Sequence, residues 1–317
     1  MEVLTGRKLI SQQLQVGAVL LHELLGLRAE EEIFLAEESL EDLTALSVTF
    51  EMLYSGIDAD RAIEISGDLG VALHLAEPME FWLILTDRYS EEKPLSSCRQ
   101  EVLDGLRSEK MEVERKDVPE DKFLEALVEY FARALSGELL CESCGVKEGP
   151  LYVEDRIIRL ESFLKENMPQ GRKVLEIGCG SGMGTQALLR IGLDPWSMDR
   201  DRCDLCQGLK GGFLKAERSF VLDARLLGNL FPQKSFDAVL GFMVGMIDDV
   251  NWSTWKEILR TSSSLARGSV LYTLYTRKEA EVVAKAHQEW GWQGKIIDNR
   301  DSKGIYDQWA YAANRVS

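Results

Sequence analysis

A glycine-rich turn near the middle of the chain constrains the fold more than any other feature of the sequence. Residues 174–184 read VLEIGCGSGMG, so an apolar run that contains Glu176 leads directly into alternating glycines. Glycine has no Cβ atom, so such a turn can adopt positive φ and lie against a bound molecule, while the helix that follows offers free N–H groups. Many α/β proteins also need a glycine turn merely to pass from strand to helix. The segment therefore predicts an α/β fold, with a ligand site at the turn as one of two interpretations.

Helices and strands alternate from residue 151 to the end of the chain. Apolar runs predict seven strands, at residues 173–177, 196–198, 220–222, 238–242, 270–276, 295–298 and 308–313. Helical periodicity predicts helices at residues 152–167, 183–190, 251–264 and 277–290. This order predicts a doubly wound, mostly parallel seven-stranded sheet of the Rossmann-like kind. The last two strands are close enough in sequence to form an antiparallel hairpin.

Residues 1–140 carry a different pattern, and we predict a separate, acidic and mainly helical domain there. Apolar residues recur at helical spacing over residues 14–24 and again over residues 123–135. The contiguous apolar stretch 80–86 could instead be a buried strand, which leaves a small mixed α+β unit as the alternative. Residues 136–150 are rich in Gly, Ser, Glu and Cys, so we place a linker at 141–150 and the second domain at 151–317.

Charge divides unequally between the two halves of the chain. Residues 1–150 hold 32 Asp and Glu against 14 Lys and Arg, whereas the remainder holds 21 against 23. An acidic surface repels phosphate backbones, so nucleic acid is not expected as the main partner. No uninterrupted apolar run reaches the roughly 20 residues of a membrane-spanning helix, and no secretory signal is recognisable, so we expect a soluble, cytoplasmic protein. Nothing in the sequence indicates an oligomeric state.

Acidic residues stand at the ends of predicted strands, where a parallel sheet binds its ligands. Asp199 closes the second strand, Asp223 follows the third, and Phe236-Asp237 opens the fourth. An ionised carboxylate has two oxygens that can accept both donors of a vicinal diol. Together with the glycine turn, these segments resemble the motifs of class I S-adenosylmethionine-dependent methyltransferases, in the same order and at similar intervals, over residues 151–317.

The resemblance implies a role for each matching residue. The acidic residue before Gly-x-Gly-x-Gly is Glu176, which would support the loop or the amino group of the ligand. The glycines would lie beneath the methionine moiety, Asp199 would accept hydrogen bonds from the ribose hydroxyls, and Asp223 would contact the adenine amino group. The cofactor-binding residues expected on this basis are Glu176, Gly178, Cys179, Gly180, Gly182, Asp199, Arg200, Asp223, Ala224 and Gly241.

A nicotinamide dinucleotide site is the main competing interpretation of the same turn. That fold also places glycines after its first strand and an acidic residue at the end of its second. Its pattern requires Gly or Ala three positions beyond Gly180, where this sequence has Met183. It also leaves Asp223 and the Phe236-Asp237 segment unexplained, so the sequence favours S-adenosylmethionine as the cofactor.

The acceptor of the methyl group is harder to identify than the cofactor. Methyl transfer from a sulfonium needs mainly alignment of the nucleophile and exclusion of water, so a base is optional and we assign no catalytic residue. Residues 241–249 lack the Asn/Asp-Pro-Pro-Tyr/Phe pattern of many methyltransferases that act on amino groups of bases and glutamines. Asp248 or Asp249 could act as a base, orient an amine, or simply cap the next helix. We predict a small-molecule or protein acceptor, with a non-catalytic S-adenosylmethionine-binding partner or regulatory protein as the alternative.

Two Cys-x-x-Cys pairs are the most unusual feature of the composition. Cys141 and Cys144 lie in the predicted linker, and Cys203 and Cys206 lie just beyond Asp199. Four thiolates can hold one tetrahedral zinc ion or an iron–sulfur cluster. The separation of the two pairs exceeds the about 15 to 20 residues of ordinary zinc ribbons, so folding would have to bring them together. A shared metal, most simply zinc, is therefore a hypothesis beside that of unrelated thiols.

Overall fold

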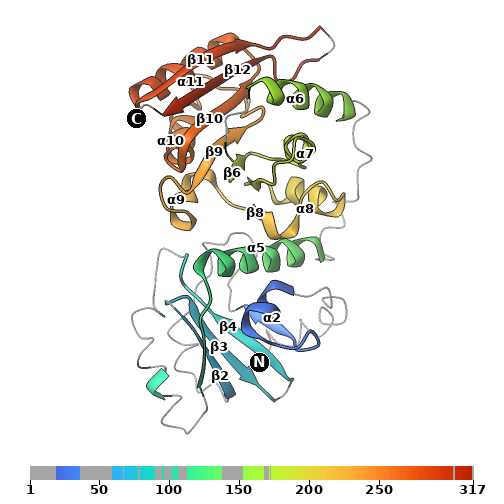
Figure 1. The fold of residues 1–317 in the computed structure, drawn as a ribbon, viewed down its shortest axis with the longest axis vertical. Coiled ribbons are helices and arrows are strands. Elements are labelled where there is room, and N and C mark those ends of the chain that lie inside the picture. Colours follow the sequence, from blue (N-terminus) through green and yellow to red (C-terminus); the bar gives the residue numbers. More distant parts are fainter. Residues whose placement is uncertain are drawn as a thin grey trace. The chain divides into compact units, whose positions relative to one another are not determined.

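The structure, a computed structural model, describes residues 19–35, 59–66, 68–77, 79–89, 95, 101, 103–105, 113–137, 153–167, 171, 173–302 and 304–315. The chain divides into two compact units, Met1–Leu140 and Cys141–Ser317. Each unit has its own sheet, and we describe each by itself (Figure 1). None of the helices in the described ranges combines the length and the hydropathy that a membrane crossing requires.

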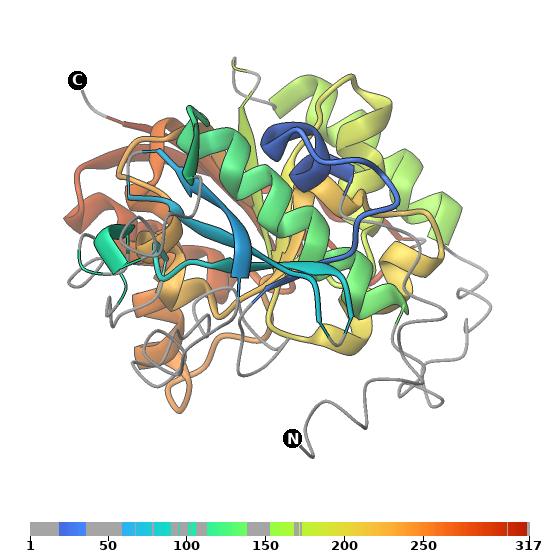
Figure 2. The same cartoon turned by 90° about the horizontal axis from the view of Figure 1, so that it is seen from below.

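The N-terminal unit is built on a five-stranded mixed sheet. Its strands are β1 (Ile33–Leu35), β2 (Ala59–Ile65), β3 (Gly70–Leu75), β4 (Phe81–Leu85) and β5 (Val113–Lys116), in the order β1-β4-β3-β2-β5. The three central strands pair antiparallel, and β1 and β5 join the two edges in parallel. The helices α2 (Val19–Leu25) and α5 (Glu120–Gly137) pack against each other beside this sheet (Figure 2).

The prediction of a mainly helical N-terminal domain is not confirmed, and the described residues of this unit fit the mixed α+β alternative. The apolar stretch 80–86 contains strand β4. In β3 all residues from Gly70 to His74 are buried, so the strand is covered on both faces. A strand covered on both faces shows a continuous apolar run instead of alternation, and periodicity alone cannot separate such a run from a buried helix.

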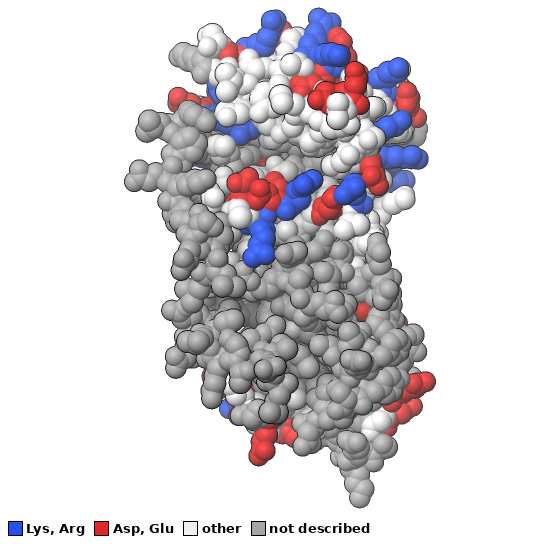
Figure 3. Space-filling view, turned by 180° about the vertical axis from the view of Figure 1, so that it is seen from behind, with Lys and Arg blue, Asp and Glu red and all other residues white. Residues whose placement is uncertain are grey.

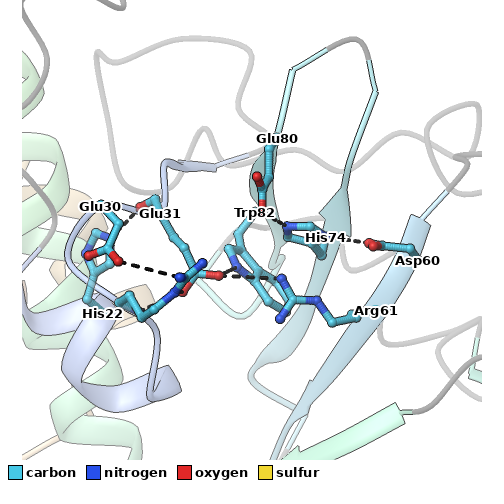
Figure 4. A network of polar contacts seen from close by, with 9 residues as sticks. His22, Glu30, Glu31, Asp60, Arg61, His74, Glu80 and Trp82 are labelled. Atoms are coloured by element: carbon cyan, nitrogen blue, oxygen red, sulfur yellow. Dashed lines mark hydrogen bonds and ion pairs between the residues drawn. The ribbon is translucent and has the colours of Figure 1, made fainter.

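A network of polar side chains joins the loop after α2 to this sheet (Figure 4). Glu31 accepts hydrogen bonds from the backbone N–H of Arg28 at 2.7 Å and from the indole N–H of Trp82 at 3.2 Å. Burial alone would raise the pKa of Glu31, but these hydrogen bonds and the charge of Arg28 lower it to about 2. His74 lies opposite Trp82, with ring centroids 5.0 Å apart, and pairs with Asp60. Part of the acidity of this half is therefore used in internal contacts of the unit.

The C-terminal unit contains the predicted seven-stranded sheet. Its strands are β6 (Val174–Ile177), β7 (Trp196–Asp199), β8 (Ser219–Val221), β9 (Phe236–Gly241), β10 (Ala266–Leu274), β11 (Trp292–Asp298) and β12 (Trp309–Arg315). Their order is β11-β12-β10-β9-β6-β7-β8. Every neighbouring pair is parallel except those of β12, which runs antiparallel to β10 and β11. The mostly parallel sheet and its terminal hairpin are confirmed.

Helices cover both faces of this sheet, as a doubly wound fold requires. They are α6 (Val153–Asn167), α7 (Met183–Arg190), α8 (Arg202–Lys210), α9 (Leu227–Leu230), α10 (Trp252–Ser264) and α11 (Arg277–Glu289). On one face, Leu164 of α6 and Leu188 of α7 join a core cluster with Leu271 of β10. On the other face, His287 of α11 packs against Tyr272, the next residue of β10, with ring centroids 5.3 Å apart. Adjacent residues of one strand thus pack against helices on opposite faces.

Candidate functional site

The direction in which the chain crosses the sheet reverses between β6 and β9. From β6 the chain moves outward to β7 and β8, and it then returns to the other side of β6 as β9, so that Ile177 pairs with Gly241. In open α/β sheets, ligands bind outside the carboxyl ends of the strands at such a reversal. The predicted glycine loop leaves β6 at this point, and the candidate site is therefore built outward from it.

The glycine loop places two glycines in front of open space. Gly178 and Gly180 have φ of +65° and +53°, values that residues with a Cβ atom rarely adopt. No described atom lies within 4 Å of a Cβ built on Gly178, and the nearest to one on Gly180 is a carboxylate oxygen of Asp204 at 4.0 Å. Both residues therefore present bare backbone to a volume that a ligand can fill.

Two other glycines of the same segment serve packing. A Cβ on Gly182 would lie 2.9 Å from the side chain of Leu214. One on Gly184 would lie 2.3 Å from both Glu176 Oε1 and the ring of Phe242. Gly182 also precedes α7 as its N-cap and makes no side-chain capping bond, so the first N–H groups of α7 remain directed toward the loop. The alternating glycines thus divide into a pair facing open space and a pair required by the core.

Asp199 ties the glycine loop to the end of β7. Its Oδ2 accepts the backbone N–H of Gly180 at 2.8 Å, and its Oδ1 accepts that of Asp201 at 2.8 Å. Each carboxylate oxygen has two lone pairs, so each keeps one further acceptor position. The arrangement suits a group with two neighbouring hydroxyl donors, as the sequence predicted for this residue. Arg200, which follows, is exposed.

Glu176 lies beneath the loop and is 1% exposed. Its Oε2 accepts the hydroxyls of Thr185 at 2.5 Å and of Ser197 at 3.1 Å, which join α7 and β7 to β6. Burial raises the pKa of Glu176 to about 7, against the effect of these two hydrogen bonds and of the nearby charge of Arg156. Of its two predicted roles, this geometry supports that of holding the loop and the start of α7.

The burial of Glu176 makes stability depend on pH near neutrality. Its pKa is about 7 in the fold against 4.5 for a free carboxyl, so ionisation opposes folding above pH 7 by on the order of 3 kcal/mol. The cost disappears below the unfolded-state pKa, so the contribution favours folding at low pH and is lost as pH rises through 7. Glu176→Gln should remove this dependence. In urea unfolding, we expect the free energy of unfolding of the variant, relative to that of the wild type, to increase from pH 5.5 to pH 8.

The control for this pH experiment is Glu154→Gln. Glu154 is exposed, and its hydrogen bond from Arg190 lowers its pKa, so it does not titrate between pH 5.5 and pH 8. The free energy of unfolding of that variant should differ from that of the wild type by the same amount at pH 5.5 and at pH 8. A Glu176→Gln protein whose stability changes with pH as the wild type does would contradict the assignment of a raised pKa to Glu176.

Asp223 follows β8 at the same edge of the sheet and is engaged by Arg225. Arg225 donates to it through the backbone N–H at 3.0 Å, through Nε at 3.0 and 3.1 Å, and through Nη2 at 2.7 Å. The hydrogen bonds and charge of Arg225 hold the pKa of Asp223 below its usual range, against the effect of burial. The charge of Arg200 adds to this. Ala224 lies between them in a turn of 3-10 helix, η4 (Ala224–Leu226).

Backbone N–H groups of the segment after β9 donate hydrogen bonds to side chains that fix its path. Met243 N–H donates to Thr273 Oγ1 at 2.8 Å, and Ile247 N–H donates to Glu279 Oε1 at 2.9 Å. Asp248 Oδ1 accepts the N–H groups of Val250 and Asn251, so Asp248 closes the turn before α10. The N-cap of α10 is Asn251 and no side chain makes a capping bond there, so the helix-cap alternative predicted for Asp248 is not observed in this form. Gly241, the last residue of β9, is buried, and a Cβ there would lie 2.4 Å from Val244.

A buried ion pair lies beside this segment. Arg156 of α6 donates from Nε to Asp307 Oδ2 at 2.8 Å and from Nη2 to Oδ1 at 3.2 Å, and the two residues are 7% and 4% exposed. Asp307 Oδ1 also accepts the hydroxyl of Thr273 at 2.5 Å. Asp307 and Met243 both have φ of 59°, and the Asp307 N–H donates to the sulfur of Met243. Two non-glycine residues in left-handed conformation thus meet in one corner, a feature that concentrates near functional sites.

The positions of the described cysteines do not support the hypothesis of a shared metal ion. Cys203 and Cys206 both lie in α8, but Cys203 is exposed whereas Cys206 is 1% exposed in the core. Two thiolates that share an ion must face the same volume, and this difference in exposure does not support a shared ion. Cys141 and Cys144 lie outside the described residues. Within the described ranges, no group of three or more His, Cys, Asp or Glu side chains is arranged to hold a metal ion.

The structure places the other predicted site residues around the loop and adds some that sequence reasoning missed. Cys179 is 6% exposed, its backbone N–H donates to Met198 O at 3.0 Å, and its carbonyl oxygen accepts the N–H of Gly182 at 2.9 Å, so this residue holds the shape of the loop. The engagement of Asp223 by Arg225 was missed, although the Asp-x-Arg spacing signals it. The Arg156–Asp307 pair was also missed, because 151 positions separate its members and no local pattern marks it.

Comparison with known proteins matches about half of the chain to solved methyltransferases. An S-adenosylmethionine-dependent methyltransferase from Archaeoglobus fulgidus is 16% identical, covers 51% of this chain and 94% of its own, and gives a TM-score of 0.41. An amino pentose methyltransferase from Micromonospora echinaspora, with S-adenosylmethionine bound, is 12% identical. The match covers 52% of this chain and 92% of that protein, with a TM-score of 0.39. Magnesium protoporphyrin IX methyltransferase from Synechocystis PCC 6803, also with bound S-adenosylmethionine, is 12% identical. The match covers 63% of this chain and 99% of that protein, with a TM-score of 0.40.

No protein-family model matches the sequence, and no curated protein matches it either. The names of these solved proteins describe them as methyltransferases, and each matches little more than half of this chain. Their identities and TM-scores are low, so the functional argument rests on the residues of the site itself.

Proposed function

We propose that the C-terminal unit binds S-adenosylmethionine at the glycine loop and transfers its methyl group to a small-molecule or protein acceptor. The observation that carries the proposal is the geometry of the loop: Gly178 and Gly180 combine positive φ with open space. Asp199 fixes the same loop and keeps one acceptor position on each oxygen. This set of groups fits a nucleoside whose ribose diol binds the carboxylate while its amino-acid portion lies on bare backbone.

The residues of the chain would bind and orient this cofactor. The N–H groups at the start of α7 lie next to the loop and suit a carboxylate, which a helix N-terminus stabilises. Asp223, at the carboxyl end of the neighbouring strand β8, would accept a hydrogen bond from the base. When bound, the sulfonium supplies an activated methyl group. The protein then has to align the acceptor and exclude water, which requires no dedicated base.

The acceptor would bind on the β10 side of the cofactor. Strands lie about 4.8 Å apart, so the end of β10 is about 10 Å from the end of β6, with β9 between them. Tyr275 follows β10 there, and its ring centroid lies 6.3 Å from that of Tyr306, over which Arg156 is placed at 5.0 Å. Burial raises the pKa of Tyr275, so its hydroxyl stays protonated and able to donate. We propose that this aromatic pair contacts the acceptor.

The surface charge fits such an acceptor better than a nucleic acid. On the described surface visible in Figure 3, basic and acidic side chains alternate over the C-terminal unit, and a phosphate backbone would meet no continuous basic track there. Nucleic-acid affinity depends on neutralising several phosphates with Lys and Arg. On this face, the mixed charge therefore favours a small-molecule or protein acceptor over a nucleic acid.

Asp199→Ala is expected to weaken binding of S-adenosylhomocysteine, the demethylated cofactor, by about 1.5 to 3 kcal/mol. The reason is the loss of charge-assisted hydrogen bonds to the ribose together with the bond that fixes Gly180. Titration calorimetry measures the effect.

The matched control is Asp237→Ala. Asp237 also accepts a backbone N–H, that of Lys173 at 2.9 Å, but it lies at the start of β9, at the amino ends of the parallel strands and away from the glycine loop. Its removal should leave the affinity unchanged. Absence of binding by the wild type would refute the proposed function, and equal losses in both variants would refute the ribose contact of Asp199.

The alternative of a non-catalytic S-adenosylmethionine-binding protein differs in one measurable outcome. Incubation with S-adenosylmethionine and a desalted cell extract should produce S-adenosylhomocysteine only if the protein is an enzyme, and the Gly180→Val variant provides the background rate. A wild type that binds the cofactor and forms no product with extracts that contain its partners would favour the alternative.

A further inference from the structure

Arg225 surrounds the carboxylate of Asp223 with hydrogen bonds, and this limits which groups of a nucleoside base the carboxylate can accept. We propose that Arg225 is a positioning residue that leaves Asp223 one acceptor position, so that the site selects a 6-amino purine over a 6-oxo purine. This inference rests on the proposed function, because it concerns how the same site reads the base of its nucleoside. Its basis is the geometry of four hydrogen bonds from one residue.

Counting lone pairs shows what remains free on the carboxylate. An ionised carboxylate has about four acceptor positions, two on each oxygen. Oδ1 of Asp223 accepts the backbone N–H and the Nε–H of Arg225, both at 3.0 Å, which fills it. Oδ2 accepts Nη2 at 2.7 Å and only the longer share of the same Nε–H, at 3.1 Å. One position on Oδ2 therefore remains, among the contacts of the described residues.

One free position on an anion discriminates between the two kinds of purine. The exocyclic amine of adenine has an N–H that can donate to it. The 6-oxo group of hypoxanthine would instead place a carbonyl oxygen against a carboxylate that has no proton to give. Leaving buried polar groups unpaired in this way is the usual origin of strong rejection by a binding site.

The structure holds this arrangement before any ligand arrives. Asp223 is the N-cap of η4, so its backbone position is fixed by the start of that turn. Arg225 Nη1 also lies 4.0 Å from Glu257 of α10, which gives the guanidinium a second anionic neighbour. A carboxylate already oriented costs less conformational freedom on binding. Without Arg225, the Asp223 side chain could rotate toward water and no longer repel a carbonyl oxygen.

The chain contains a matched control for this proposal. Arg300 engages Asp298 in the same way, with Nε at 2.9 and 3.1 Å, Nη2 at 2.6 Å and the backbone N–H at 3.2 Å. That pair follows β11, whereas Asp223 follows β8, and these two strands form the opposite edges of the sheet. Removing Arg300 therefore takes away an equivalent local structure without touching the glycine-loop side.

The test is calorimetric titration of wild type, Arg225→Ala, Arg225→Lys and Arg300→Ala with S-adenosylhomocysteine and with its 6-oxo analogue, S-inosylhomocysteine. We expect the wild type to prefer the amino compound by roughly 30-fold or more. Arg225→Ala should lower this ratio about tenfold, and Arg225→Lys should restore little of it, since an ammonium cannot form the planar two-point contact. Arg300→Ala should keep the wild-type ratio.

Each outcome decides between the inference and the proposed function. A wild type that binds neither compound would refute the proposed function. A wild type that binds S-adenosylhomocysteine, together with an Arg225→Ala protein whose ratio is unchanged or higher, would overturn the role of Arg225 alone. A uniform loss of affinity for both compounds in Arg225→Ala would also overturn it, because a merely structural role weakens binding without changing the ratio.

Discussion

The Gly180→Val protein is expected to lose about 100-fold or more of its affinity for S-adenosylhomocysteine, which corresponds to about 3 kcal/mol. Gly180 has φ of +53° and faces open space, so the branched side chain would occupy the volume that we assign to the ligand. A β-branched residue is also stiff and resists positive φ, so the loop would be displaced from its present path. Titration calorimetry at one temperature measures the loss.

The chain offers a control that carries the same backbone strain. Gly192, just after α7, has φ of +83° and no described atom within 4 Å of a built Cβ, as at Gly178 in the loop. Gly192→Val should destabilise the fold about as much as Gly180→Val, by ~1–2 kcal/mol, because each forces a left-handed residue. It should bind S-adenosylhomocysteine like the wild type. Equal affinity of Gly180→Val and Gly192→Val would remove the glycine loop from the site.

The architecture of the C-terminal unit could be predicted because its local signals agree with one another. The strand that ends at Ile177 passes directly into glycines, and the predicted helix 183–190 coincides with α7. The predicted strand 295–298 is shorter than β11, which begins at Trp292. Gln293 and Gly294 are exposed and interrupt the apolar pattern after Trp292, so the predicted strand begins three residues late. The predicted boundaries are inaccurate where a strand has one solvated face, whereas the predicted type and order of the elements agree with the structure.

The N-terminal unit could not be predicted in the same way, because its central strand β3 is covered on both faces. Burial of the stretch from Gly70 to His74 erases the alternation that marks a half-exposed strand. His74 itself looks like a break in an apolar run, yet it is 3% exposed and pairs with Asp60 from the neighbouring strand. Partners that are brought together by folding leave no periodic signal. The contact of Glu31 with Trp82 belongs to the same class.

Long-range pairing also explains which part of the candidate site was missed. The residues of the glycine loop are local to one motif, and Asp199 and Asp223 follow predicted strands, so their meeting at one edge follows from the parallel order of the sheet. The side that we propose for the acceptor includes instead Arg156 of α6 and Asp307 beyond β11, which the sequence alone does not connect.

Arg156→Ala is therefore expected to cost the C-terminal unit about 3–5 kcal/mol of stability, because it leaves the carboxylate of Asp307 buried without a counter-charge. Six of the seven tryptophans lie in this unit, so the fluorescence change during urea unfolding reports mainly on it. The control is Arg159→Ala, one turn further along α6. Its side chain is 26% exposed and its Nη1 lies 3.7 Å from Asp301 Oδ2, and a surface pair of this kind contributes about 0–1 kcal/mol.

A double variant separates the charge effect from simple loss of packing. Arg156→Met with Asp307→Asn removes both charges, keeps similar volume, and places at position 307 a residue that tolerates the φ of 59° found there. Because replacing a whole buried ion pair is often nearly neutral, this variant should recover most of the stability lost by Arg156→Ala. If Arg156→Ala instead resembles Arg159→Ala, the pair does not hold the corner that joins α6 to the segment after β9. The acceptor-side wall would then have to be stabilised by the Thr273 and Glu279 contacts alone.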